Sequence, residues 1–186
     1  VDRLAERLHT TLGLTRGDRI ATVLFNDDVT VLIYFAAWIL GIAVVPINIE
    51  ESSDRKRYIL EHAEVAAAFC WEDVYPEIKD LQADLPSLRE IVGVGDGGLH
   101  AMPQQSASGR THRTLASPRP CPSTSQLDDP ALIVYTSGTT GQPKGVVLTG
   151  TNLLIDADAI AAWHGFGPND RLMCVLPVHH VNGIVV

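Results

Sequence analysis

Residues 20–47 read IATVLFNDDVTVLIYFAAWILGIAVVPI, and this stretch decides the fold class. It contains two short apolar runs, 20–25 and 42–47, and the second is rich in β-branched residues. Asn26 or Asp27 can cap a helix between the two runs. Strands that are apolar on both faces are typical of a parallel sheet covered by helices. The stretch therefore predicts a buried strand–helix–strand unit.

The same region has an alternative interpretation as a membrane-spanning helix. Residues 29–49 carry no charge and are long enough to cross a bilayer. However, Gly41 is a natural helix C-cap, Pro46 breaks a helix, and the flanks are acidic and offer no basic anchor. These features favour a buried helix followed by a buried strand, and no transmembrane segment is predicted.

The alternation of helices and strands continues on both sides of this unit. Upstream, Gly13 is placed to end a helix whose apolar residues recur at helical spacing: Leu4, Ala5, Leu8 and Leu12. Downstream, Ser53 can cap a helix and Pro76 can open one. The elements predicted there are a helix over 54–64, a strand over 65–70, a helix over 76–85 and a strand over 91–94. We expect an α/β fold with parallel-rich sheets covered by helices.

The composition changes over residues 95–130, which are rich in Gly, Ser, Pro and Gln and show no apolar period. We expect a long exposed connection there. Its scattered cations are interpreted as solvated rather than as an anion site: Arg110, His112, Arg113 and Arg119. The pattern after it predicts strands over 131–135 and 146–148, a helix from Thr151 or Asn152 to about His164, and a buried strand over 172–176.

Composition and charge exclude several classes of protein. The 186 residues are 46% hydrophobic and 19% charged, which is ordinary for a globular chain. A net charge of -8 without a dense Lys/Arg block argues against a nucleic-acid binder. Cys70, Cys121 and Cys174 are few and far apart, which favours a reducing, cytoplasmic setting over a disulfide framework or a zinc site. The chain begins without Met or a leader and ends in an apolar stretch, so we expect a piece of a longer protein.

Residues 135–147, YTSGTTGQPKGVV, carry the pattern that points most directly to chemistry. The glycines among them allow positive backbone dihedrals and close approach, so that successive N–H groups can converge on an anion: Gly138, Gly141 and Gly145. Lys144 adds a compact positive charge. Hydroxyl donors come from Thr136, Ser137, Thr139 and Thr140. The sequence predicts a phosphate-holding loop between two strands.

This segment differs from the nucleotide P-loop, G-x-x-x-x-G-K-[ST]. Gln142 and Pro143 precede the lysine, and Gly145 stands where the magnesium-binding hydroxyl of a P-loop would be. A hairpin loop without function is the remaining alternative. It is disfavoured because four hydroxyls, three glycines and a lysine fall within residues 136–145.

The segment resembles the phosphate-loop signature of the adenylate-forming (AMP-binding) superfamily, which includes acyl-CoA synthetases, luciferases and nonribosomal-peptide adenylation domains. The turn at Gly17, Asp18 and Arg19 and the region from Gly41 to Pro46 resemble the early part of that family's large N-terminal domain. The resemblance therefore covers nearly all of residues 1–186. It implies a partial N-terminal adenylation domain, with the C-terminal domain absent.

The resemblance also implies a reaction and a role for the loop. In that family a carboxylate attacks the α-phosphate of ATP, pyrophosphate leaves, and a thiol then attacks the acyl-adenylate. By analogy the loop would grip the β- and γ-phosphates, while Lys144 would offset charge growing on pyrophosphate. The implied nucleotide-binding residues are Thr136, Ser137, Gly138, Thr139, Thr140, Gly141, Gln142, Pro143, Lys144 and Gly145.

Residues 176–183, LPVHHVNG, resemble a second family segment, in which a proline, a histidine three residues later and a glycine line the acyl and nucleotide pocket. His180 takes the histidine's place, and Asn182 and Gly183 complete the implied substrate pocket. His179 and His180 do not predict a metal site, because neighbours on an extended chain point to opposite faces and no third ligand is evident. Family members often carry an aromatic residue at the position of His179 and a histidine at that of Gly150.

The proline, histidine and glycine pattern favours an acid–thiol ligase of the acyl-CoA synthetase kind, with ATP, CoA and a small-molecule carboxylic acid as substrates. An amino-acid adenylation domain and a nucleotide-binding module without catalysis are the alternatives. The family's magnesium-holding acidic segment, ribose-binding aspartate, hinge and late lysine are expected beyond Val186. The ligands of Mg²⁺ are therefore expected mostly outside this chain, which we expect to be inactive when isolated.

Overall fold

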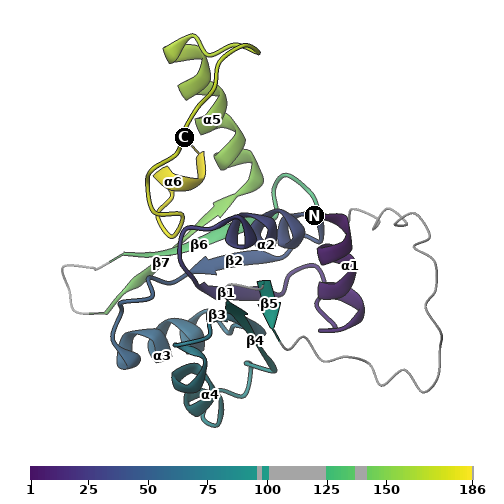
Figure 1. The fold of residues 1–186 in the computed structure, drawn as a ribbon, viewed down its shortest axis with the longest axis vertical. Coiled ribbons are helices and arrows are strands. Elements are labelled where there is room, and N and C mark those ends of the chain that lie inside the picture. The colour runs from purple at the N-terminus through teal and green to yellow at the C-terminus, as the bar shows by residue number, and fades with distance from the viewer. Residues whose placement is uncertain (96–97, 101–124, 137–141, 186) are drawn as a thin grey trace.

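A computed structural model of the chain describes residues 1–95, 98–100, 125–136 and 142–185. Its strands form one sheet with the order β5-β4-β3-β1-β2-β6-β7 (Figure 1). The elements are α1 (Asp2–Thr10), β1 (Arg19–Val23), α2 (Asp28–Ile39), β2 (Ala43–Pro46), α3 (Ser53–His62), β3 (Ala67–Trp71), α4 (Tyr75–Gln82), β4 (Glu90–Gly95), β5 (Gly98–His100), β6 (Pro130–Thr136), β7 (Lys144–Thr149), α5 (Gly150–His164) and α6 (Asn182–Val185).

The centre of the sheet is parallel and its two edges are antiparallel. Strand β1 lies between β2 and β3, β3 pairs with β4, β2 pairs with β6, and all of these pairs are parallel. Strand β5 is antiparallel to β4, and β7 is antiparallel to β6. The predicted parallel-rich α/β fold is confirmed. The connection expected from Gly95 onward begins instead with β5, which extends the sheet; residues 96–97 and 101–124 of that connection lie outside the described residues.

Successive residues of the central strands enter two different cores, one on each face of the sheet. Ile20 and Phe69 belong to the core beneath α1 and α2, together with Leu8 and Ile33. Their chain neighbours Ala21, Ala68 and Cys70 face the other core, which also contains Ile59 of α3 and Ile78 of α4. Because side chains alternate along a strand, only a sheet covered on both faces needs such continuous apolar runs. The strands are therefore apolar for the reason predicted.

The uncharged region 29–49 folds as a helix followed by a strand, as predicted. Asp27 caps α2, with Oδ1 accepting a hydrogen bond from the Thr30 N–H at 2.7 Å. Gly41 ends the helical path with a φ of +69°, and β2 follows. Among the residues described, no helix is both long enough and apolar enough to cross a membrane.

Two helix caps lie upstream of their predicted positions. Ser52, not Ser53, caps α3, because its hydroxyl accepts from the Arg55 N–H at 3.4 Å, while the Ser53 hydroxyl donates to Glu77 Oε1 at 2.7 Å. Thr149, not Thr151 or Asn152, caps α5. The Thr149 hydroxyl accepts from the Asn152 N–H at 3.2 Å, and the Thr149 N–H donates to Asn152 Oδ1 at 2.9 Å. This reciprocal capping box makes Asn152 the third residue of the helix instead of its cap.

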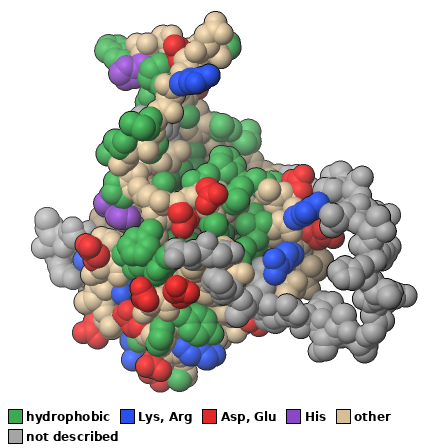
Figure 2. Space-filling view, viewed as in Figure 1, with side chains coloured by type: hydrophobic (Ala, Val, Ile, Leu, Met, Phe, Trp, Pro, Cys, Tyr) green, Lys and Arg blue, Asp and Glu red, His purple; other side chains and the backbone are tan. Residues whose placement is uncertain are grey.

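The buried strand predicted over 172–176 is wrong. These residues are irregular, and the side chains of Met173 and Val175 are 84% and 72% exposed. A strand requires a neighbour to receive its backbone hydrogen bonds, and the described part of the chain offers none to this segment. Hydrophobic side chains are exposed over α5 as well, whereas charged side chains of both signs surround α3 and α4 (Figure 2).

A seam joins β6 to the strands that precede it in the chain. Val44 of β2 pairs with Leu132 of β6, and the Trp38 Nε1–H donates to the Ala131 carbonyl oxygen at 2.8 Å. Arg16 donates through Nη2 to Asp129 Oδ1 at 2.7 Å. Contacts between residues so distant in sequence place β6 beside β2, and we call this set the β2–β6 seam.

Candidate functional site

The parallel strands bring several chain segments to one edge of the sheet. Strands β1, β2, β3 and β6 run in the same direction, so the residues that follow each of them lie along the same, carboxyl edge. In open α/β sheets this edge is where ligands bind. The two described ends of the predicted phosphate loop, the end of β6 at Thr136 and the start of β7 at Lys144, lie at that edge (Figure 1).

The described residues of the predicted loop are its two ends. Thr136 ends β6 and pairs with Lys144 at the start of β7, after Gln142 and Pro143. The Lys144 side chain belongs to an exposed residue, and no carboxylate in the described ranges pairs with it. Five of the predicted nucleotide-binding residues lie outside those ranges: Ser137, Gly138, Thr139, Thr140 and Gly141.

Gly145 serves close packing and not an unusual dihedral. Its φ is not positive, which corrects the prediction that it supplies left-handed backbone. A Cβ at this position would lie 3.1 Å from Ile133 Cγ2 and 3.2 Å from Tyr135 Cζ. Tyr135, which is directly opposite on β6, therefore lies over the bare backbone of Gly145.

Two residues of α3 that the sequence analysis did not single out contact the loop ends. Tyr58 Oη donates to the Pro143 carbonyl oxygen at 3.1 Å, and a hydrogen bond of 2.7 Å joins His62 Nδ1 to Tyr135 Oη. Burial, and secondarily Tyr58, raises the pKa of Tyr135 to about 12. The only signal in the sequence is that Tyr58 and His62 are four residues apart and share a helix face.

The second predicted cluster, residues 176–183, is held over the carboxyl end of β1 by Asn26. The Asn26 amide donates through Nδ2 to the Leu176 carbonyl oxygen at 3.0 Å, and its Oδ1 accepts from the Val178 N–H at 2.8 Å. Tyr34 Oη donates to the Val178 carbonyl oxygen at 3.0 Å. Burial raises the pKa of Tyr34 to about 12, so this phenol remains a donor at neutral pH.

The predicted pocket residues lie in a turn that leads into α6. The His180 N–H donates to the Pro177 carbonyl oxygen at 3.0 Å, and Asn182 begins α6 with an exposed side chain. Gly183 is buried, and a Cβ there would overlap the Pro177 carbonyl oxygen, so only glycine fits. No hydrogen bond joins this turn to the described ends of the phosphate loop.

The two histidine rings do not point to opposite faces. Because residues 178–181 form a turn and not a strand, the centroids of His179 and His180 are 4.3 Å apart. Burial and the neighbouring His180 lower the pKa of His179, and Glu51 and Glu50 act in the opposite direction. Within the described part of the chain, no group of three or more His, Cys, Asp or Glu side chains is placed to hold a metal ion.

We expect the turn at 176–183 to become less firmly attached to the end of β1 when Asn26 is replaced by alanine. Both hydrogen bonds of the Asn26 amide are lost, which should destabilise the turn by about 1–2 kcal/mol. The Val178 N–H then has no acceptor from Asn26 and should exchange with solvent faster. Amide hydrogen exchange at Val178 measures this. Asn48→Ala is the matched control, since Asn48 follows the neighbouring strand β2 and accepts from the Glu50 N–H. Equal exchange at Val178 in both variants would contradict the role of Asn26.

A pH dependence follows from His179. The folded pKa is lowered from the ordinary value of 6.5, so the unfolded chain binds the proton more readily. The contribution of neutral His179 to the free energy of unfolding is therefore complete above pH 6.5. It is lost as the pH falls from 6.5 toward the pKa of His179 in the folded protein. Urea midpoints measured from about pH 8 to about pH 5.5 should fall less in His179→Gln than in the parent. If the urea midpoints of the parent and of His179→Gln fell equally with pH, the assignment of this pH dependence to His179 would be disproved.

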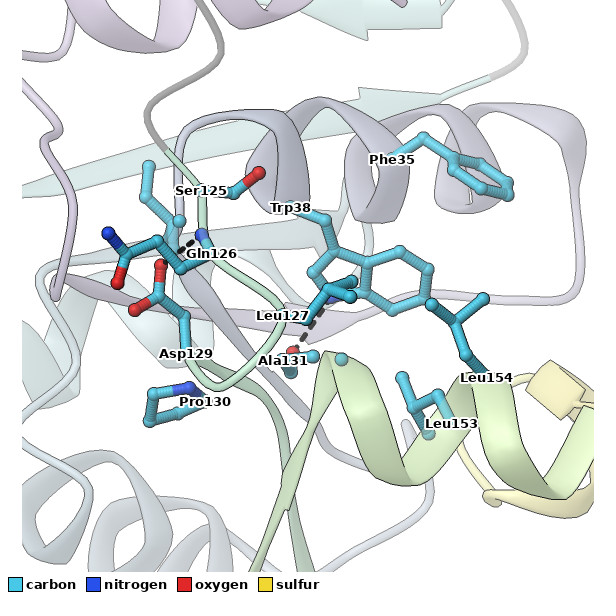
Figure 3. A pocket seen from close by; sticks show the side chains of 13 residues that line it. Phe35, Trp38, Ser125, Gln126, Leu127, Asp129, Pro130, Ala131, Leu153 and Leu154 are labelled. Carbon is cyan, nitrogen blue, oxygen red and sulfur yellow. Dashed lines mark hydrogen bonds between the residues drawn. The ribbon is translucent and has the colours of Figure 1, made fainter.

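A separate pocket of ≈ 310 Å³ lies at the opposite, amino edge of the sheet. Phe35 and Trp38 of α2 face Leu153 and Leu154 of α5 across it, and the turn before β6 closes one side (Figure 3). Its carboxylate, Asp129, is engaged by Arg16, whose hydrogen bond holds the pKa of Asp129 below its usual value. This largely apolar pocket is remote from the phosphate loop and offers no cation to a nucleotide.

Comparison with known proteins agrees with both the motif and the fold. The family model described as AMP-binding enzyme matches residues 1–186. The chain is 35% identical over 184 residues to the sulfoacetate–CoA ligase of Cupriavidus necator, covering 97% of this chain and 34% of that protein. It is 30% identical over 179 residues to the long-chain-fatty-acid–CoA ligase FadD15 of Mycobacterium tuberculosis, covering 92% of this chain and 29% of that protein.

Solved structures give the same answer. ATP-bound MatB from Rhodopseudomonas palustris superposes with a TM-score of 0.77 at 27% identity, over 99% of this chain and 35% of that one. The N-terminal domain of FACL13 from Mycobacterium tuberculosis gives a TM-score of 0.76 at 28% identity, over 99% of this chain and 44% of that one. The chain thus spans about a third of the length of the curated relatives it matches.

A match along the whole chain, a sheet of the same architecture and a signature loop at its carboxyl edge lead to one conclusion: the chain belongs to the family of AMP-binding enzymes.

Proposed function

We propose that the natural polypeptide carrying these residues is an acid–thiol ligase of the acyl-CoA synthetase type, in which residues 1–186 are part of the N-terminal adenylation domain. The observation that carries the proposal is an exposed Lys144 opposite Thr136 at the carboxyl edge of the sheet, with no carboxylate of the described chain paired to it. Relatives that match nearly the whole chain are named as CoA ligases.

The reaction has two steps that share one site. A carboxylate oxygen of the acid attacks the α-phosphorus of ATP, the bond from that phosphorus to the bridging oxygen breaks, and pyrophosphate leaves. The CoA thiol, having lost its proton, then attacks the acyl carbon, and AMP leaves with the electron pair of the acyl–oxygen bond. Both steps need negative charge on a leaving phosphate to be stabilised.

The loop ends fit the pyrophosphate end of ATP. Lys144 is the register partner of Thr136 across the hairpin, and the sequence between them contains hydroxyl residues and glycines suited to holding phosphate. Lys144 is the residue assigned to catalysis, because it would stabilise charge as pyrophosphate departs. Magnesium would offset part of the phosphate charge of the bound nucleotide, and its protein ligands are expected mostly beyond residues 1–186.

The turn at 176–183 is assigned to the acyl side of the site. His180, Asn182 and Gly183 lie in or beside a turn fixed to the end of β1, at the same sheet edge as the loop. Gly183 keeps the turn tight because no side chain fits there. A reducing, cytoplasmic setting is part of this proposal, since the two described cysteines, Cys70 and Cys174, are free thiols.

Acid-dependent exchange between ATP and radioactive pyrophosphate tests the proposal in the natural polypeptide. The acids tried should be sulfoacetate, a long-chain fatty acid, 2-succinylbenzoate and a set of amino acids, which are chosen from the names of relatives and from the alternative class. Exchange with an acid, and release of AMP on adding CoA, is the expected result. Exchange with amino acids alone would indicate an amino-acid adenylation domain, and nucleotide binding without exchange would indicate a non-catalytic module.

A further inference from the structure

One face of α3 presents two aromatic side chains toward the hairpin formed by β6 and β7. Tyr58 and His62 are one helical turn apart, and their rings stack with centroids 5.3 Å apart and an interplanar angle of 24°. Both rings meet Tyr135 of β6 edge to face, with centroids 6.4 Å and 5.7 Å from it. The three rings form one cluster that joins a helix to the hairpin.

The hydrogen bonds of this cluster reach both strands of the hairpin. His62 bonds to Tyr135 on β6 at 2.7 Å, and Tyr58 donates to the Pro143 carbonyl oxygen, before β7, at 3.1 Å. Tyr135 directly precedes Thr136, and Pro143 directly precedes Lys144. Each bond therefore fixes the residue beside one of the two described groups that would contact phosphate.

Helix α3 is itself a fixed support. Lys56, whose side chain is 5% exposed, pairs with Glu77 of α4 at 2.8 Å, and Ser53 donates to the same carboxylate at 2.7 Å. Ile59 and Leu60 of the same helix are buried in the core beneath α3 and α4, against which Tyr58 and Tyr135 also pack. A support held by buried contacts limits the motion of the groups attached to it, whereas β7 is an edge strand that pairs with no further strand in the described part of the chain.

We propose that Tyr58 and His62 are positioning residues that hold the two ends of the phosphate loop in register for ATP. The inference rests on the proposed function for its substrate. Neither side chain contacts phosphate; they act through Tyr135 and Pro143. Because catalysis by preorganised donors depends on their placement, loosening the loop ends should weaken ATP use specifically.

Two variants of the natural polypeptide separate this role from general stability. Tyr58→Phe removes the phenolic oxygen and keeps the ring, while His62→Phe removes Nδ1 and keeps a ring that can stack. We expect each to lower kcat/KM for ATP in pyrophosphate exchange by about fivefold, the worth of one hydrogen bond, with the KM of the carboxylic acid unchanged. Tyr75→Phe on α4, which packs against β3 and β4, is the matched control.

Amide hydrogen exchange gives a second readout that needs no activity. In both variants, amide hydrogen exchange should accelerate at Thr136, Gln142, Lys144 and Gly145 and remain as in the parent at β3. Unchanged protection of the hairpin amides from hydrogen exchange would overturn the inference. An equal worsening of the kinetic parameters for ATP and for the acid, together with a lower melting temperature, would overturn it as well. The parent could show no acid-dependent pyrophosphate exchange while both variants still accelerate amide hydrogen exchange in the hairpin. In that case the proposed ligase function fails, but the role of α3 in holding the loop ends stands.

Discussion

Replacing Lys144 by alanine should lower the rate of acid-dependent pyrophosphate exchange by about 100-fold in the natural polypeptide, the usual effect of removing one preorganised group that stabilises developing charge. The described structure offers this lysine no carboxylate partner, and Thr136 lies directly across the hairpin. Its loss should therefore leave the fold intact and weaken the hold on ATP phosphates. Steady-state kinetics with ATP varied, together with the thermal unfolding midpoint, measure both consequences.

Two further variants serve as controls: one removes a different lysine, and the other places a different cation at position 144. Lys79→Ala on α4 removes a lysine whose Nζ donates to Gln82 Oε1 at 2.6 Å, far from the carboxyl edge, and should leave the exchange rate unchanged. Lys144→Arg keeps the charge but not the compact ammonium, so it should recover only part of the rate. An unchanged rate in Lys144→Ala would remove the loop from the proposed mechanism.

Replacing Glu77 by alanine should lower the free energy of unfolding by about 2–3 kcal/mol. Glu77 is the carboxylate that pairs with Lys56, and the lysine side chain is 5% exposed. Breaking a buried pair leaves a charge without its partner, at a cost of about 3–5 kcal/mol in a fully buried site. The partial exposure of Glu77, 29% of its side chain, reduces that figure. Denaturant unfolding at neutral pH measures the change.

A double variant decides whether charge pairing is the cause. Lys56→Met combined with Glu77→Leu removes both charges, so most of the lost stability should return. Burial alone would raise the pKa of Glu77, but hydrogen bonds from Lys56 and Ser53 outweigh it and lower the pKa below its ordinary 4.5. Its contribution is therefore present above that value and lost as pH falls through the folded pKa. A double variant as unstable as Glu77→Ala would contradict this explanation.

The elements that could be predicted from the sequence are those whose pattern is local. The apolar runs of β1 and β2, the helix between them and the cap Asp27 follow from composition and spacing within residues 20–47. Caps were misplaced where a second polar residue competed, as Asn152 does for Thr149. The stretch 172–176 is apolar enough to be a strand, yet a strand exists only where a neighbour pairs with it, and a single sequence does not contain that information.

The residues of the candidate site likewise separate into those indicated by local pattern and those that depend on tertiary contacts. The signature over 135–147 identified the loop because its residue types carry the chemistry. Tyr58 and His62 could not be found in this way, because their role depends on α3 lying beside a hairpin more than seventy residues later. Asn26 was considered only as a helix cap, whereas its amide holds the turn at 176–183. Residues that act through tertiary contacts leave little trace in local pattern.

The β2–β6 seam bears on the order in which the protein is made. As the chain leaves the ribosome, the strands β1 to β5 emerge before any part of β6, and together with helices α1 to α4 they supply most of both cores, to which β6 later adds Leu132. The seam to β6 closes through contacts between residues about ninety positions apart, such as Val44 with Leu132 and Trp38 with Ala131. We therefore expect the nascent N-terminal half to fold first and to serve as the template onto which the hairpin of β6 and β7 is added, so that the hairpin is the first part to detach during partial unfolding.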